Sequence, residues 1–206
     1  LGDVFQNFST LAMEIELTPT ASNVLFGYWS HDVGGFHNGT DDPGDNDPKS
    51  SGAAELLLRW VQFGAFSPIF RTHGEPAADR YLWDFSTFPV MKELLLLRNA
   101  LVPHIYTMAW QAHHTAVSIL RPMYYAFPET EAAYGFKGQY MFGADVLVAP
   151  IASGLDAPGG SVKKPVWLPP VSSAWVTWDG LWSSEGGRVV NGSYALEDMP
   201  VFVRAG

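Results

Sequence analysis

Cysteine is absent from the 206 residues of this chain, which excludes disulfide bonds and thiolate-ligated metal sites. Positive charge is scarce: 12 Lys and Arg stand against 21 Asp and Glu, the net charge is −9, and no segment gathers basic residues. A protein that binds a phosphate backbone needs clustered Lys and Arg, so we expect no nucleic-acid partner. No apolar run approaches the roughly 20 residues of a membrane span, so we expect no membrane partner.

What remains is the composition of a folded protein with a sizeable core. Hydrophobic residues make up 47% of the chain, aromatic residues 14% and charged residues 16%. Disordered chains are poor in hydrophobic residues and rich in charge. The many aromatic residues suit a surface that stacks against sugar rings as well as they suit an ordinary core.

Helical and strand-like segments alternate in the first 121 residues. Apolar residues at helical spacing predict a short amphipathic helix near the start and a second helix over 53–64. The apolar runs NVLFGYW (23–29) and AFSPIFR (65–71) predict two buried strands. A long helical stretch over 88–119 should be kinked or divided at Pro103. This alternation predicts parallel strands joined by right-handed crossovers.

The pattern changes from about residue 139. Short apolar runs are separated by Gly, Pro, Asp and Asn at intervals of roughly ten residues, which predicts the antiparallel strands of a sandwich. We therefore expect an α/β part over residues 1–130, followed by an all-β part, a truncated β-sandwich, over residues 131–206. The runs are YMFGADVLVAP, KKPVWLP, AWVTWDG, GRVVNGSYAL and MPVFVRAG.

Polar residues follow the two predicted strands. Asp32 comes directly after the first strand, and Arg71 and His73 come directly after the second. Parallel α/β folds bind ligands outside the carboxyl ends of their strands, so these three side chains should lie on one rim, with Asp32 within about 10 Å, two strand spacings, of Arg71. A carboxylate, a guanidinium and an imidazole beside an aromatic wall, which Trp29 and Phe36 could supply, suit an uncharged, hydroxyl-rich ring such as a sugar.

Five segments of the sequence resemble, in order and spacing, the C-terminal half of glycoside hydrolase family 31. The family consists of retaining α-glucosidases and α-xylosidases on a (β/α)8 barrel, so the resemblance implies that the first part is the end of such a barrel. The segments are GDVFQNFSTLA, FGYWSHDVGGF, LLLRWVQFGAFSPIFRTHGEP, LRNALVPHIYTMAWQAH and GQYMFGADVLVAPI.

The resemblance implies a role for each polar residue. Asp3, in GDV, matches the position of the family's catalytic general acid/base. Asp32, Arg71 and His73 match residues that bind the glycosyl unit. Phe36, and less closely Trp29, match aromatic walls of the pocket. No metal ion and no organic cofactor is implied. Arg59 and Trp60 lie in a further family motif, and we interpret both as residues that pack the barrel.

The family's nucleophile, an aspartate in a motif of the type W-x-D-M-N-E, is not found in this chain. Trp83-Asp84-Phe85 shares two letters with that motif but follows Asp3 instead of preceding it. We therefore expect a fragment whose partner is the N-terminal remainder of the same enzyme, and we expect the 206 residues alone to be inactive. The predicted substrate is an α-glucoside.

Two other functions stay open: an α-xylosidase with the same machinery, and a non-catalytic carbohydrate-binding protein on a decayed glycosidase fold.

Structural interpretations also exist for single residues. Asp32 could cap backbone N–H groups of the glycine turn behind it. The acidic loop with Asp41, Asp42, Asp45 and Asp47 could bind Ca²⁺, but it lacks the ligand order of an EF-hand.

Overall fold

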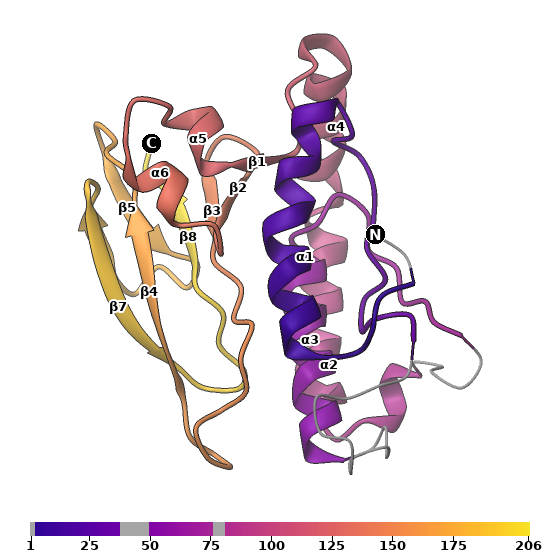
Figure 1. Ribbon diagram of the computed structural model, residues 1–206. Helices are drawn as coiled ribbons and strands as arrows, with labels where there is room; N and C mark the ends of the chain where they lie inside the picture. The colour runs from indigo at the N-terminus through magenta and orange to yellow at the C-terminus, as the bar shows by residue number, and fades with distance from the viewer. Residues whose placement is uncertain (1–2, 38–49, 76–80) are drawn as a thin grey trace.

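The structure, a computed structural model, describes residues 3–37, 50–75 and 81–206. Helices form the first part of the chain and antiparallel strands form the second, and the two lie side by side (Figure 1). The first part contains α1 (Phe8–Thr20), the 3-10 helix η1 (Ala21–Val24), α2 (Ser51–Ala65), the 3-10 helix η3 (Leu82–Asp84), α3 (Phe88–Ala100) and α4 (Val102–Thr115). The second contains β1 (Leu120–Pro122), α5 (Met123–Ala126), α6 (Ala132–Gly135), β2 (Tyr140–Phe142), β3 (Val146–Val148), β4 (Val162–Leu168), β5 (Ala174–Thr177), β6 (Ser183–Glu185), β7 (Arg188–Tyr194) and β8 (Val201–Arg204).

The predicted helices are confirmed. The side chain of Asn7 caps α1 by accepting the backbone N–H of Thr10 at 2.7 Å, and Ser50 caps α2 in the same way. The long helical stretch is divided as expected, with α3 ending two residues before α4 begins and Pro103 in the first turn of α4. α4 ends at Thr115, before residue 119, where the predicted helical stretch ended, because Ala116 takes a left-handed conformation with φ of 58°.

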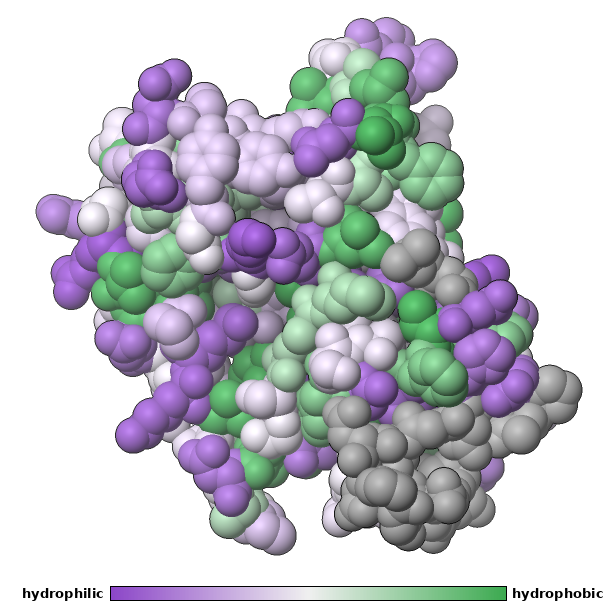
Figure 2. Space-filling view, in the orientation of Figure 1, coloured by the Kyte–Doolittle hydropathy of each residue, from purple (hydrophilic) through white to green (hydrophobic). Residues whose placement is uncertain are grey.

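The prediction of a buried strand over residues 23–29 is wrong. The segment begins with the end of η1 and continues without strand pairing. Four of its apolar side chains are more than half exposed, namely Val24, Leu25, Phe26 and Tyr28. A short apolar run predicts that its side chains are buried, but it does not show which part of the protein they pack against. No described residues cover the side chains of this run. Figure 2 shows hydrophobic residues at the upper right of the molecule, where η1 follows α1.

The strand predicted over residues 65–71 is also wrong. Ala65 ends α2, and residues 66–69 form a turn instead of an extended strand. Parallel pairing does occur, but it begins after residue 29 and after residue 71, where the two predicted strands ended. It consists of two isolated bridges, Phe5 with His37 and Val33 with Thr72.

The second part confirms the predicted antiparallel sandwich. One sheet has six strands in the order β1-β2-β3-β8-β5-β6, and β4 and β7 form a second sheet of two strands. Every pairing in both sheets is antiparallel. The longest ladder joins β4 to β7 over seven residue pairs, from Val162 with Tyr194 to Leu168 with Arg188.

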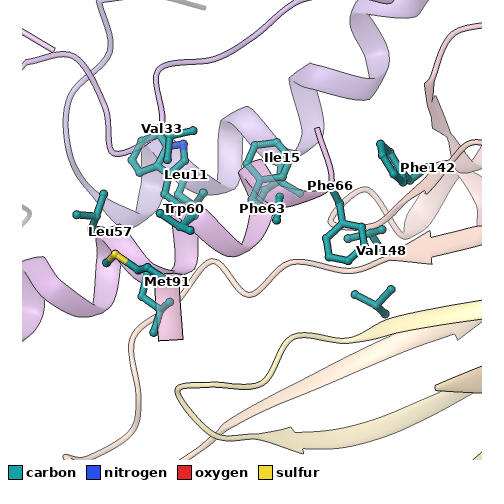
Figure 3. Packing of buried hydrophobic residues seen from close by; sticks show 14 of the residues in the cluster. Leu11, Ile15, Val33, Leu57, Trp60, Phe63, Phe66, Met91, Phe142 and Val148 are labelled. Carbon is teal, nitrogen blue, oxygen red and sulfur yellow. The ribbon is translucent and has the colours of Figure 1, made fainter. Parts of the chain in front are cut away.

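The central strands of the larger sheet face two separate cores. Alternate residues of β2, β3 and β8 point in opposite directions, as the pleat requires. Tyr140, Phe142, Val146, Val148 and Val201 pack with the helices, among Leu11, Trp60, Phe63 and Phe66 (Figure 3). Met141, Leu147 and Phe202 pack instead against β4 and β5, with Val166, Trp167, Leu168 and Trp175. The sheet is therefore the middle layer of three.

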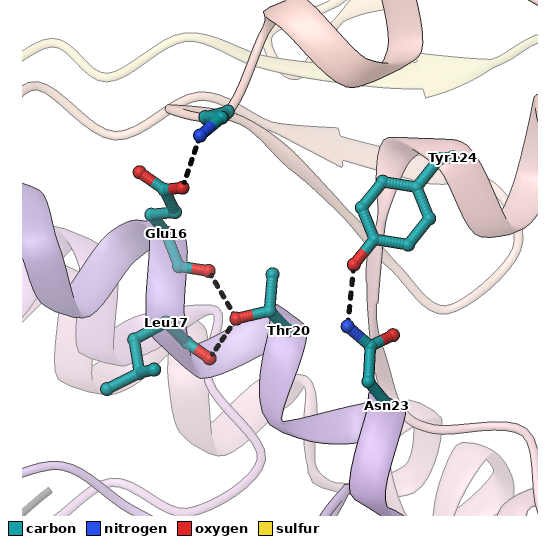
Figure 4. A network of polar contacts seen from close by, with 6 residues as sticks. Glu16, Leu17, Thr20, Asn23 and Tyr124 are labelled. Atoms are coloured by element: carbon teal, nitrogen blue, oxygen red, sulfur yellow. Dashed lines mark hydrogen bonds and ion pairs between the residues drawn. The ribbon is translucent and has the colours of Figure 1, made fainter.

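Buried and exposed polar contacts also connect the two parts. Arg59 of α2 is fully buried and donates to the carbonyl oxygens of Asp198, at 2.8 Å, and Ala195, at 3.1 Å. At the surface, Glu16 of α1 pairs with Lys137, and the amide of Asn23 donates to the hydroxyl of Tyr124 (Figure 4). Trp60 packs in the core of the helical part as predicted, whereas Arg59 connects that part to the β domain.

Candidate active site

Three extended segments lie side by side where the polar residues gather. Residues 3–6 and residues 33–37 are joined by hydrogen bonds from the backbone N–H of Phe36 and His37 to the carbonyl of Val4, at 2.7 and 2.9 Å. On the other side, the N–H of Val33 donates to the carbonyl of Arg71 at 3.0 Å. The bridges between these segments are parallel. Their polar residues therefore meet at one edge, as the ends of neighbouring barrel strands do.

Asp32 and Arg71 form an ion pair at this edge. The guanidinium Nη2 of Arg71 contacts Oδ1 of Asp32, which confirms that the two residues lie together. The Asp32 side chain is 1% exposed and that of Arg71 is 49% exposed. The carboxylate is thus a buried, fixed acceptor, whereas the guanidinium keeps donors free to reach a ligand.

The two glycines that follow Asp32 allow the backbone to turn sharply. Gly34 and Gly35 have φ of 97° and 80°, and the N–H of Gly35 returns to the carbonyl of Asp32 at 2.9 Å. A Cβ on Gly35 would lie 3.0 Å from Cα of Gln6. The absence of a side chain at Gly35 therefore lets the neighbouring segment approach closely.

Phe36 connects the remaining predicted residues. Its ring centroid lies 5.4 Å from that of His73. Its backbone joins Val4, the neighbour of Asp3, on one side and Glu75 on the other. Asp3 is exposed and has a left-handed φ of 61°, which is uncommon for a residue with a side chain. Asp3, Phe36 and His73 thus follow one another across the edge.

Trp29 is less closely tied to this group. Its ring lies 5.9 Å from that of Phe26, and its Nε1 is buried without a hydrogen-bond partner among the described residues. No hydrogen bond joins its indole to Asp32 or Arg71 in the part of the chain that the structure describes. It lies three residues before Asp32 and is partly buried.

Three features of this region escaped the sequence reasoning. His37 lies 3.4 Å from the carboxylate of Glu75, at the outer side of Phe36. Glu14 of α1 is fully buried, and burial raises the pKa of its carboxyl to about 7, with the negative charge of Asp32 as a smaller cause in the same direction. His31 is also fully buried, and burial lowers its pKa to about 3. The buried position of Glu14 on the helical pattern was the available signal.

Metal-binding and membrane-spanning features were searched for over the described residues. No group of three or more His, Asp or Glu side chains there is arranged to hold a metal ion. No helix in those residues has the length and apolar character of a membrane span. The acidic loop with Asp41, Asp42, Asp45 and Asp47 lies outside the described residues.

Comparison with known proteins agrees with the geometry. The model of the glycosyl hydrolases family 31 TIM-barrel domain matches residues 1–108, and that of the family 31 C-terminal domain matches residues 116–206. The chain belongs to glycoside hydrolase family 31. The predicted fold class is therefore confirmed: the chain holds the end of a (β/α)8 barrel followed by the C-terminal β domain of that family.

Relatives in family 31 with recorded activities are longer than this chain. An α-xylosidase of Saccharolobus solfataricus is 32% identical over the whole chain, which covers 26% of that enzyme. Alpha-glucosidase 2 of Bacillus thermoamyloliquefaciens is 30% identical over 85% of the chain, which corresponds to 20% of that enzyme. The chain thus spans about a quarter or less of these relatives.

Solved family 31 structures have the same fold. The crystal structure of an α-xylosidase from a soil metagenome, complexed with xylose, matches 98% of the chain with a TM-score of 0.85 and 30% identity. This chain covers 31% of that structure. A dextranase of Flavobacterium johnsoniae, complexed with isomaltotriose, matches 96% of the chain with a TM-score of 0.83 and 28% identity.

Proposed function

We propose that this chain is the acid/base-bearing part of a retaining α-glucosidase, which hydrolyses terminal α-linked glucosyl residues. The remainder of the enzyme, on the N-terminal side, would supply the nucleophile. The division of the chain into a barrel part over residues 1–130 and a β-sandwich part over residues 131–206 belongs to the same proposal. No metal ion and no organic cofactor enters the chemistry.

The observation that carries this proposal is the Asp32–Arg71 pair at the edge of three parallel segments. The Asp32 carboxylate is 1% exposed and accepts from Arg71, so a sugar hydroxyl would reach its lone pairs by taking the place of part of that contact. Arg71, half exposed, can donate to a neighbouring hydroxyl of the same ring. Phe36 and His73, whose ring centroids lie 5.4 Å apart with planes tilted by 51°, each offer an aromatic face on which a sugar ring can stack. Trp29 has an N–H without a partner among the described residues and is proposed as a further wall.

Asp3 is proposed as the general acid and base. In a retaining mechanism, two carboxyl groups stand about 5–5.5 Å apart across the glycosidic bond. The nucleophile forms the glycosyl ester while Asp3, protonated, gives its proton to the departing oxygen. Asp3, then a carboxylate, takes a proton from the water that releases the sugar and the configuration at the anomeric carbon is retained. The exposure of Asp3 in this chain supports the proposal, because a substrate can approach an exposed side chain.

The Asp3→Ala variant of the full-length enzyme tests this role. Hydrolysis of a glucoside with a poor leaving group should fall by about 10²–10⁴-fold. Hydrolysis of α-glucosyl fluoride should fall far less in its first step, because fluoride departs without protonation. Azide should restore turnover of the fluoride by replacing the activated water. Equal losses on both substrates, with no effect of azide, would remove Asp3 from this role.

An α-xylosidase is the second candidate, and the identity of 32% to an enzyme of that activity favours it. The two activities share their carboxylates and differ in how the pocket treats the 6-hydroxymethyl group of glucose. The ratio of kcat/KM for p-nitrophenyl α-glucoside to that for p-nitrophenyl α-xyloside decides between them. A ratio above one supports the glucosidase, and a ratio well below one supports the xylosidase.

A non-catalytic carbohydrate-binding protein is the candidate of a different class. It would keep the Asp32–Arg71 pair and lack the nucleophile in the remainder of the protein. Binding of glucose without turnover of either aryl glycoside by the full-length protein would favour it over both enzymes.

A further inference from the structure

His31 is a buried polar side chain next to the candidate site, and both of its ring nitrogens have partners. It precedes Asp32, is fully buried, and its ring stacks on Phe63 of α2 with centroids 4.3 Å apart and planes 7° apart. Both of its ring nitrogens have partners: Nδ1 lies 3.2 Å from Nε1 of Trp60, and Nε2 lies 3.1 Å from Oγ of Ser67. A ring held on one face and at both nitrogens cannot turn without breaking a buried contact.

The partners fix which nitrogen carries the proton. The indole of Trp60 can only donate, so Nδ1 of His31 accepts. Burial lowers the pKa of His31 to about 3, with nearby positive charge, including that of Arg71, acting in the same direction. The ring is therefore neutral, and its Nε2–H donates to Ser67. The hydroxyl of Ser67 in turn donates to the carbonyl of Phe63 at 3.1 Å.

This hydrogen-bond chain joins the segments that carry Asp32 and Arg71. His31 precedes the carboxylate by one residue, and Ser67 precedes the guanidinium by four. The turn with Ser67 is itself held by Arg98 of α3, which donates to the carbonyl oxygens of Ser67 and of Pro68, the latter at 2.7 Å. After Asp32, Val33 enters the core beside Trp60 and Leu11 (Figure 3). Asp32 is thus anchored on both sides to groups of α2.

We propose that His31 is a positioning residue for the sugar-binding pair: Trp60 and Ser67 hold its ring, and the ring sets the Asp32 carboxylate against Arg71. The inference rests on the proposed function for the identity of the ligand, a neutral glycosyl ring. His31 makes no contact with that ring. Its effect reaches the ligand through the backbone of Asp32, where a displacement of about 1 Å can cost as much as 100-fold.

A positioning role and a merely structural role differ in what they change. Loss of fold stability reduces the fraction of active protein, so kcat per total enzyme falls while KM and inhibition constants stay. Misplacement of Asp32 weakens binding of the sugar in every folded molecule. The inhibition constant of 1-deoxynojirimycin, an iminosugar of the size of one glucosyl unit, therefore separates the two.

Trp60→Phe in the full-length enzyme is the main test. It removes the donor to Nδ1 of His31 and keeps an aromatic side chain in the core. Trp175→Phe is the matched control, because Trp175 is also fully buried and donates its indole N–H, at 2.9 Å, to the carbonyl of Pro169 in the sandwich. We expect Trp60→Phe to raise KM and the inhibition constant about 10- to 100-fold and Trp175→Phe to change both less than about twofold.

Ser67→Ala is the second variant, in case Trp60→Phe does not fold. It removes the acceptor for Nε2–H and leaves every ring in place, and the inhibition constant should again rise. Unchanged constants in both variants would overturn the inference. So would an equal rise in Trp175→Phe, because loss of a distant buried bond would then suffice.

Turnover by the wild type tests the proposed function separately. If the wild type hydrolyses neither aryl glycoside, the proposed function fails, and the inference is decided by crystal structures of the wild type and Trp60→Phe. The Asp32 carboxylate should move from the Arg71 guanidinium by about 1 Å or more in the variant. An unchanged ion pair there would overturn the inference whatever the activity.

Discussion

The two parts of the chain hold their extended segments in different ways. In the C-terminal part, eight strands pair in antiparallel ladders, the longest over seven residue pairs. In the N-terminal part, three segments meet through two isolated bridges, a few backbone hydrogen bonds and the Asp32–Arg71 ion pair. The β domain is therefore ordered mainly by its backbone. The candidate site depends on individual side chains, which is typical of regions that carry function.

The second difference is in what each part leaves exposed. Eleven large hydrophobic side chains among the described N-terminal residues are more than half exposed, among them Val24, Leu25, Phe26 and Tyr28 after α1 and Tyr106 and Trp110 on α4. Exposed apolar surface of this kind marks an interaction site. The comparison teaches that the sandwich is covered by its own second sheet, whereas the helical part is not covered by the residues described.

The largest expected effect is loss of activity in the 206 residues alone. A retaining mechanism needs a nucleophile as well as an acid, and removal of one member of such a set lowers kcat by several orders of magnitude. Maltose and p-nitrophenyl α-glucoside should show no turnover, and the exposed apolar side chains after α1 should promote aggregation in light scattering. Turnover near 10 per second, an ordinary enzyme rate, would show a complete site within this chain.

The next effect concerns the contact between the two parts. Arg59→Met should lower the free energy of unfolding by about 1.5–3 kcal/mol, because it removes two part-buried hydrogen bonds from the buried guanidinium to the carbonyls of residues 195 and 198. Arg204→Met is the matched control, since Arg204 pairs with Asp145 at the surface and should cost at most about 1 kcal/mol. Denaturant unfolding of the protein measures both. Equal losses would contradict the distinction between buried and exposed guanidinium groups.

The third effect is a pH dependence of stability that arises from two buried groups of the site-bearing part. The pKa of His31 is lowered in the folded state from 6.5 to about 3, so its contribution to stability is present above pH 6.5 and is lost as the pH falls toward 3. The pKa of Glu14 is raised from 4.5 to about 7, so its contribution is present below pH 4.5 and is lost as the pH rises toward 7. Between pH 4.5 and 6.5 the two contributions to the free energy of unfolding have opposite slopes: that of His31 rises with pH and that of Glu14 falls.

Glu14→Gln should remove one of these slopes. Between pH 4.5 and 6.5 the variant should lose up to about 1.4 kcal/mol of stability per unit of falling pH relative to the wild type. Glu16→Gln, at an exposed position of the same helix, is the matched control and should follow the wild type. Thermal unfolding across this pH range gives the three curves. Parallel curves for wild type and Glu14→Gln would rule out an opposing contribution of Glu14.

The smallest effect is at the start of α1. Asn7→Ala removes the side-chain acceptor of the Thr10 N–H and should cost about 1 kcal/mol. Asn7→Asp keeps an acceptor there and should recover most of that loss. Denaturant midpoints measure the difference, and an alanine variant as stable as the aspartate variant would contradict the capping role.

Much of this architecture could be predicted from the sequence. Helical spacing located α1 and α2, Pro103 located the break between α3 and α4, and turn residues separated β4, β5, β7 and β8. The position of Asp32 and Arg71 after apolar runs was enough to predict that the two residues lie close together. The short strands β1 and β6 were not predicted, because three residues carry too little pattern to be distinguished from a turn.

The errors have a common physical cause. Residues 23–29 and 65–71 are apolar, and apolar composition alone does not decide between strand, turn and exposed loop. Nor does sequence show which polar groups a fold will bury together. His31 reads as an ordinary residue before Asp32, and its partners Trp60 and Ser67 are about 30 and 36 positions away. Only the tertiary structure places the three in contact.

The larger sheet lies between two cores, and this restricts how the C-terminal part can change length. In β2, β3 and β8, one insertion or deletion within a strand would exchange every side chain between the helix-facing core and the sandwich-facing core. In a sheet with one solvent-exposed face, the same change would disturb only one core. Changes in chain length in this part of the family should therefore accumulate in connections such as residues 149–161 and 169–173, and β2, β3 and β8 should keep their lengths.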